Sequence, residues 1–251
     1  MSTTAALTRT EWFKLRTTPA LPVTAVLVTG LVLVAAATNV VLAGQGGLPP
    51  LGSEENVGKV LAVAPATGVA MLVLGIMIGA GENATRAIIG TYLGEPRRNR
   101  VLQAKLLAGG GLGAIAGAGV FALTWGVGAG LFALRGVHHL QADVVGLAVG
   151  TVLVTATFGL VGVALGALGR NMVSAIVGAL VWVGVVELAV LQPLWPSVDR
   201  WFPAGSAVAL TSIRHSGDHL LAVPVAAAVL TGWAALLCLI AMGTSLRKDV
   251  R

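Results

Sequence analysis

The sequence predicts an all-α integral membrane protein with six transmembrane helices, and its composition and apolar patterning are the basis of that prediction. Of the 251 residues, 56% are hydrophobic and only 10% are charged. The mean hydropathy is +0.90, and the apolar residues gather in six long runs. One soluble core cannot hide so much apolar surface. Helices fit runs of about 20 residues better than barrel strands, because a spanning helix pairs its own backbone groups.

Each apolar run is long enough to cross a membrane as a helix. The expected spans are 21–43, 60–80, 106–134, 144–168, 172–191 and 221–244. The third span exceeds the hydrocarbon thickness, so we expect it to tilt or bend. The first is longer than the apolar core of a cleavable secretion signal and is expected to remain as an anchor. We therefore expect residues 1–251 to form a single transmembrane domain.

Lys and Arg residues are distributed unevenly between the two sets of connections. Twelve of the sixteen fall in the N-terminal segment, the 81–105 loop, the 169–171 turn and the C-terminal segment. Because basic residues concentrate on the cytoplasmic side, this bias places both termini and the 81–105 loop in the cytoplasm. The net charge of +6 then reflects topology, and no nucleic-acid partner is expected.

The 81–105 loop contains the pattern of a short amphipathic helix. Its stripe consists of Thr85, Ile88, Ile89, Tyr92 and Leu93. Glu82 and Arg86 stand four residues apart and can pair, and Gly94 and Pro96 end the helix before the basic run. Such a helix suits the groove of a soluble partner. The alternative is an interfacial helix that rests on lipid headgroups.

The segment before the first span is aromatic and basic. An expected helix at about residues 5–18 contains Glu11, Trp12, Lys14 and Arg16. This composition predicts an interfacial helix in contact with membrane lipid at the cytoplasmic headgroup level.

Glu187 is the only acidic residue well inside an expected span. A carboxylate is costly at that depth, so it is expected to face protein or water, and it is our intramembrane polar candidate for a role in transport. Contact with the membrane interface, or pairing with a basic residue such as Arg200, is the alternative.

Two further segments carry structural expectations. Glycines spaced by four occur at Gly109, Gly113 and Gly117, at Gly126 and Gly130, at Gly146 and Gly150, and at Gly162 and Gly166. This spacing favours close helix packing within the chain over a specific dimer face. Residues 192–220 are rich in aromatic residues and proline, which predicts a re-entrant hairpin on the outer side.

We expect no catalytic residues, no metal site and no cofactor in this chain. Cys238 is the single cysteine, and the histidines are not spaced as metal ligands. Residues 52–60 resemble a P-loop, but five residues separate the glycines and Val60 stands where Ser or Thr must bind magnesium.

The segment "GENATRAIIGTYLGEPRRNRVLQAKLLA" resembles the first intracellular loop of ABC-2 type permeases, the membrane subunits of bacterial ABC exporters. The residues that carry the resemblance are Glu82, Thr91, Pro96, Arg97, Arg98, Val101, Ala104 and Lys105. The N-terminal "EWFKLRTTP" is similar to the segment before the family's first span. "VVELAVLQPLWPSVDRWFPAGSAVAL" resembles the end of its fifth span and the hairpin that follows.

The resemblance implies a stand-alone permease with the ABC-2, type V exporter-like fold in a bacterial plasma membrane. Two permeases, identical or paralogous, would assemble with two cytoplasmic ABC ATPase subunits that bind ATP and magnesium. The implied ATPase-coupling residues are Glu82, Thr85, Arg86, Ile88, Ile89, Thr91, Tyr92, Arg97 and Arg98. The implied function is export of an apolar or amphipathic drug, peptide antibiotic or lipid. The alternative is a membrane immunity or sensor protein that binds a toxic peptide or partner protein without transporting it.

Overall fold

The computed structural model describes residues 4–17, 20–84, 98–137, 143–169, 171–212 and 220–245. All regular structure in these ranges is helical. The elements are α1 (Thr4–Thr17), α2 (Ala20–Val41), α3 (Glu54–Leu61), η1 (Ala64–Ala66), α4 (Thr67–Ala84), α6 (Arg98–Leu134), α7 (Val144–Leu168), α8 (Met172–Leu180), η2 (Val181–Leu191), α9 (Gln192–Leu194), α10 (Pro196–Asp199), α11 (Pro203–Thr211) and α12 (Val223–Ser245).

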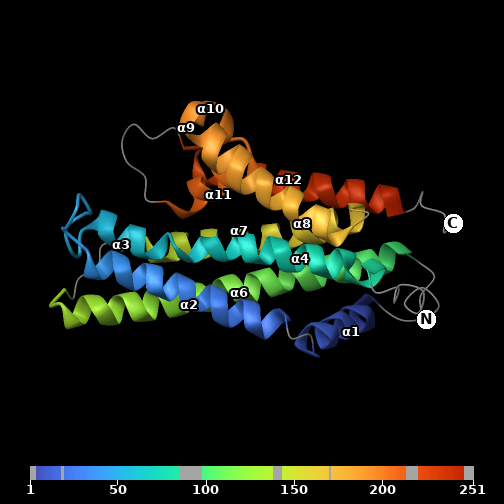
Figure 1. The fold of residues 1–251 in the computed structure, drawn as a ribbon, viewed down its shortest axis with the longest axis horizontal. Helices are drawn as coiled ribbons and strands as arrows, with labels where there is room; N and C mark the ends of the chain where they lie inside the picture. Colours follow the sequence, from blue (N-terminus) through green and yellow to red (C-terminus); the bar gives the residue numbers. More distant parts are fainter. Residues whose placement is uncertain are drawn as a thin grey trace.

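Six helical stretches of the described chain are long and apolar enough to cross a membrane, which confirms that part of the prediction. They form an elongated bundle in which α7 packs against α4, α6 and α12 (Figure 1). One end of the bundle, here called the terminal end, holds α1 and the C-terminal end of α12 (Figure 1). The opposite end, here called the far end, holds α3 and α9 to α11 (Figure 1).

The observed helices differ from the expected spans at two places. The stretch expected as one span at 60–80 is broken: α3 ends at Leu61, and α4 begins at Thr67 after the 3₁₀ turn η1. Pro65 lies in that turn, and proline cannot donate the backbone hydrogen bond that an α-helix interior needs. The helix expected at 106–134 begins earlier, at Arg98, so α6 extends into the basic part of the 81–105 loop.

The fifth span changes its hydrogen bonding part of the way along. After α8, residues of η2 form a π-helix, and the Gln192 backbone N–H donates to the Glu187 carbonyl five residues earlier. Long π-helical stretches are rare, and the π geometry is found preferentially at functional sites. Hydrophobic periodicity predicted this span but not its π geometry.

Backbone-to-backbone contact holds α7 against α4 and α6. A Cβ atom built on Gly162 of α7 would collide with the Leu72 carbonyl oxygen and lie 2.9 Å from the Gly75 Cα on α4. A Cβ atom on Gly113 of α6 would likewise collide with the Thr155 carbonyl oxygen on α7. Only glycine permits helices to approach this closely, so these residues fix the centre of the bundle.

The glycines predicted from their spacing divide into packed and open positions. Gly109 and Gly166 also face neighbouring helices at close range, which agrees with packing inside the chain. A Cβ atom built on Gly126 or Gly130 meets no described atom within 4 Å. On α4, Gly79 completes the contact with α7, although the spacing argument did not include it.

We predict opposite effects for two identical substitutions. Gly162→Ala should lower the free energy of unfolding by about 1–3 kcal/mol, because the methyl group collides with the backbone of α4. Gly126→Ala should raise it by up to about 1 kcal/mol, because alanine favours the helix and its methyl group meets open space. Denaturation with dodecyl sulfate in mixed micelles measures both values. Equal effects of the two substitutions would contradict this account of the packing.

Candidate functional site

A buried ion pair joins three helices at the terminal end. Lys105 Nζ of α6 donates a hydrogen bond of 3.0 Å to the Ile78 carbonyl oxygen of α4. The same Nζ lies 3.8 Å from Glu11 Oε2 of α1, and the two side chains are only 7% and 10% exposed. A buried charge is stable when it is paired and hydrogen-bonded. The pair therefore fixes α1 against the ends of α4 and α6 that flank residues 85–97.

The N-terminal helix was predicted from its composition, but its packing was not. Glu11 faces the bundle, whereas the aromatic and basic composition of the segment predicted a position at the headgroup level. Trp12 lies against α6, where its ring is 3.4 Å from a Cβ atom built on Gly111. The side chains of Lys14 and Arg16 lie outside the described part of the structure. A lone lysine in an apolar run and a lone acid in a basic segment were the signals that could have suggested the pair.

Most residues expected to couple the chain to an ATPase lie outside the described residues. These are Thr85, Arg86, Ile88, Ile89, Thr91, Tyr92 and Arg97. The backbone of Glu82 belongs to α4 and that of Arg98 begins α6, but neither side chain is described. The amphipathic helix in this loop therefore stays a prediction.

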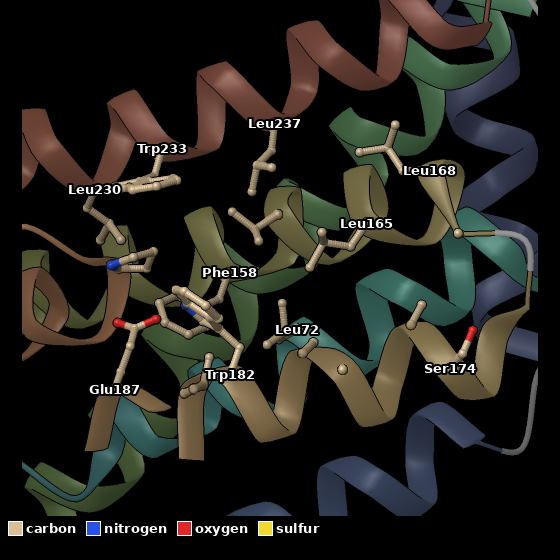
Figure 2. Close-up of a pocket in the computed structure, with 17 residues that line it drawn as sticks. Leu72, Phe158, Leu165, Leu168, Ser174, Trp182, Glu187, Leu230, Trp233 and Leu237 are labelled. Atoms are coloured by element: carbon tan, nitrogen blue, oxygen red, sulfur yellow. The ribbon is translucent and has the colours of Figure 1, made fainter. Parts of the chain in front are cut away.

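A cavity of about 510 Å³ lies between α7, the α8–η2 helix and α12 (Figure 2). Its walls are apolar and include Phe158, Leu165 and Leu237. Ser174 lies at one end and Glu187 at the other (Figure 2). Its size is in the range of sites that bind small molecules. Of the described residues that line it, only Glu187 is ionisable.

The cavity exists because α7 has two different faces. Toward α4 and α6 it presents small residues, including Gly159 and Gly162. Toward the cavity it presents large residues, Phe158, Val161 and Leu165. The small face allows contact between backbones, whereas the large face keeps α12 and the α8–η2 helix at a distance. The glycine spacing predicted the first face, and the sequence contained no comparable signal for the cavity.

Glu187 connects the cavity to the hairpin at the far end. Its Oε2 accepts a hydrogen bond of 2.6 Å from the backbone N–H of Ala204, in the first turn of α11. The residue before α11, Phe202, has no side-chain cap of its own. Glu187 thus satisfies one of the free N–H groups at this helix start and benefits from the positive end of the helix dipole.

The second oxygen of Glu187 has a different environment. Oε1 accepts no hydrogen bond from the described residues, although the side chain has no exposed surface. The Trp182 indole lies beside the carboxyl group, between it and the rest of the cavity (Figure 2). Trp182 itself is 45% exposed. The carboxyl group is therefore fully buried beside an indole that is itself partly exposed.

Three aromatic rings pack against one another near the end of the cavity that holds Glu187. Phe202 stacks on Trp233 of α12 at a centroid distance of 5.9 Å and tilts against Trp182 of η2 at 6.0 Å. Trp233 Nε1 also donates a hydrogen bond of 2.9 Å to the Trp201 carbonyl oxygen. Residues 192–211 of the expected hairpin form the short helices α9, α10 and α11, and residues 213–219 lie outside the described ranges, so its re-entrant course on the outer side stays a prediction.

Arg200, the alternative partner expected for Glu187, contacts Trp201 instead. The Arg200 guanidinium lies over the Trp201 ring, 5.8 Å from its centroid, and forms no ion pair with Glu187 in the described structure. Asp199, the last residue of α10, carries a second buried carboxyl group close to the first turn of α11, and its Oδ1 accepts no hydrogen bond from described residues. Burial raises the pKa of the Asp199 carboxyl group.

No protein-family model matches this chain, and no curated protein matches it either. The described residues also contain no group of three or more His, Cys, Asp or Glu side chains that could hold a metal ion. The candidate site is therefore defined by its geometry: an apolar cavity with one carboxyl group, and a buried ion pair at the terminal end.

We predict strong coupling between Lys105 and Glu11 in a double-mutant cycle with Lys105→Met and Glu11→Gln. The coupling free energy should be about 1–3 kcal/mol, because each single change leaves the other polar group buried with fewer partners. The matched control is the pair Lys59–Glu55, whose side chains are 43% and 48% exposed. Its coupling should be below about 0.5 kcal/mol. Equal coupling in both pairs would contradict the assigned role.

We predict that Asp199 reduces stability as pH rises. Its pKa is higher in the folded than in the unfolded protein, so the folded state binds more protons. Stability from this group is complete below the unfolded value of about 3.9 and is lost as pH rises through the raised folded pKa. Melting temperatures of the wild type and Asp199→Asn should diverge over that interval, with the variant more stable at higher pH. A difference that stays constant with pH would disprove this.

Proposed function

We propose that this chain is the transmembrane permease subunit of an ATP-driven exporter whose cargo is apolar or amphipathic. The single observation that carries the proposal is the cavity of about 510 Å³ between helices long enough to span a membrane. Because its walls are almost entirely apolar, the cavity suits a molecule that dissolves in lipid better than an ion or a sugar.

The packing of the bundle supports a route from the loop to the cavity. Helices α4 and α6 flank residues 85–97, and both contact α7 backbone to backbone. The adjoining face of α7 lines the cavity. Closely packed helices move as rigid bodies and do not deform continuously. A force applied at the loop would therefore reach the cavity wall through α7.

The resemblance to ABC-2 type permeases supplies the remainder of the proposal. The chain would pair with a second permease in a bacterial plasma membrane, with both termini in the cytoplasm. The helix at about 84–93 would contact an ABC ATPase that binds ATP and magnesium. In the alternative, an immunity or sensor protein, the same cavity would bind its ligand without using ATP.

We predict that Ile88→Asp combined with Tyr92→Asp reduces the recovery of the ATPase at least about tenfold. Two charges would replace the apolar contacts expected in the partner's groove. The measurement is affinity purification of the tagged chain from its native membrane, followed by mass spectrometry and an assay of ATP-driven efflux in vesicles.

The matched control is Leu134→Asp, which makes the same kind of change at an exposed side chain of α6 at the far end. This variant should retain the ATPase. Recovery of the wild-type chain without any ATPase, under several extraction conditions, would reject the exporter proposal and favour a sequestering or sensing protein.

A further inference from the structure

The charges around the cavity are unbalanced. Among the described residues that line it, Glu187 is the only ionisable one, and none of them is Lys, Arg or His. Asp199 lies close enough to interact electrostatically with Glu187 and adds a second acidic group at this end. The nearby guanidinium of Arg200 is placed over Trp201 instead. An occupant with one positive charge would offset this imbalance.

The capping of α11 uses only one of the two oxygen atoms of the Glu187 carboxyl group. Oε2 accepts from the Ala204 N–H, whereas Oε1 forms no hydrogen bond of regular geometry with a described residue, although the Trp182 side chain interacts with the carboxyl group. In an apolar setting an acceptor without a donor is costly, and the electrostatic field of a carboxylate reaches further than in water. Glu187 lines the cavity, and the Trp182 indole lies beside its carboxyl group (Figure 2).

The aromatic walls suit the same kind of occupant. Phe158, Trp182 and Trp233 all line the cavity, and tryptophan rings attract cations placed over their faces. The other walls, such as Leu165 and Leu237, offer only apolar contact. The best-matched molecule thus has an aromatic or branched hydrocarbon body and one positive charge, and needs few hydrogen bonds.

We infer that the cavity selects lipophilic monocations, and that Glu187 is the residue that determines this selectivity. The inference names the class of cargo for the proposed exporter, and in that respect it rests on the proposed function. The cation lies against the indole of Trp182, with the carboxylate behind that ring. A role of Glu187 in capping α11 alone is the competing explanation, and it predicts no preference for positive charge.

Three probes of related shape separate these explanations. Tetraphenylphosphonium is a cation, tetraphenylborate is an anion of the same shape, and triphenylphosphine oxide is neutral. Equilibrium binding is measured on the purified full chain in lipid nanodiscs, with empty nanodiscs subtracted. We expect saturable binding of the phosphonium ion, weaker binding of the neutral probe and no saturable binding of the borate.

Variants then test the charge. Glu187→Gln keeps an oxygen for the Ala204 N–H but removes the charge, and should weaken phosphonium binding at least about tenfold while it leaves the neutral probe unchanged. The matched control Glu55→Gln makes the same chemical change at an exposed pair and should have no effect.

A second site keeps the test valid if Glu187→Gln fails to fold. Gly178 lines the cavity, and a Cβ atom built there meets no described atom within 4 Å. Gly178→Lys should abolish phosphonium binding, whereas Gly178→Met, which adds similar bulk without charge, should retain it.

The outcomes separate the inference from the proposed function. Equal binding of cation and neutral probe, unchanged in Glu187→Gln and in Gly178→Lys, overturns the inference but leaves a binding cavity and an ATPase partner possible. Loss of the ATPase partner in the purification experiment, with cation selectivity intact, rejects the exporter but supports the selectivity of the site.

Discussion

The close approach of three helix backbones is the constraint on which the other features depend. Because α4, α6 and α7 touch through glycine, their axes and rotations are fixed by backbone atoms rather than by adaptable side chains. This leaves the large residues of α7, such as Phe158 and Val161, on the adjoining face, where α12 and the α8–η2 helix do not come equally close. The cavity thus results from the tight packing of α4, α6 and α7 beside it.

The spans were predictable where apolar sequence alone decides the structure. The fourth is the clearest case, since α7 occupies 144–168 as expected, between the Asp143 cap and Gly169. Hydropathy does not report hydrogen-bond geometry, so it missed the break at Pro65 and the change to a π-helix after Leu180. It also began α6 too late, because Lys105 looked like the end of a polar loop but is buried against Glu11 of another helix.

The candidate site was predictable only in part, for a physical reason. An acid inside an apolar run is expensive wherever it lies, so Glu187 could be singled out without knowing its surroundings. Its partners could not, because the Ala204 N–H is brought to it by a hairpin and the Trp233 ring by the last helix. The pair of Glu11 and Lys105 joins distant parts of the chain, and each residue alone looked like part of the basic cytoplasmic surface.

The position of the Glu187 side chain depends on the π-helical hydrogen bonding of η2. In η2 each backbone bond spans five residues, as between Gln192 and Glu187, and the same chain can also form the commoner four-residue pattern. A change from one pattern to the other rewinds the segment and turns its side chains about an axis that need not move. Such a change would move the Glu187 carboxyl group relative to the Ala204 N–H, so the cap of α11 and the winding of η2 depend on each other.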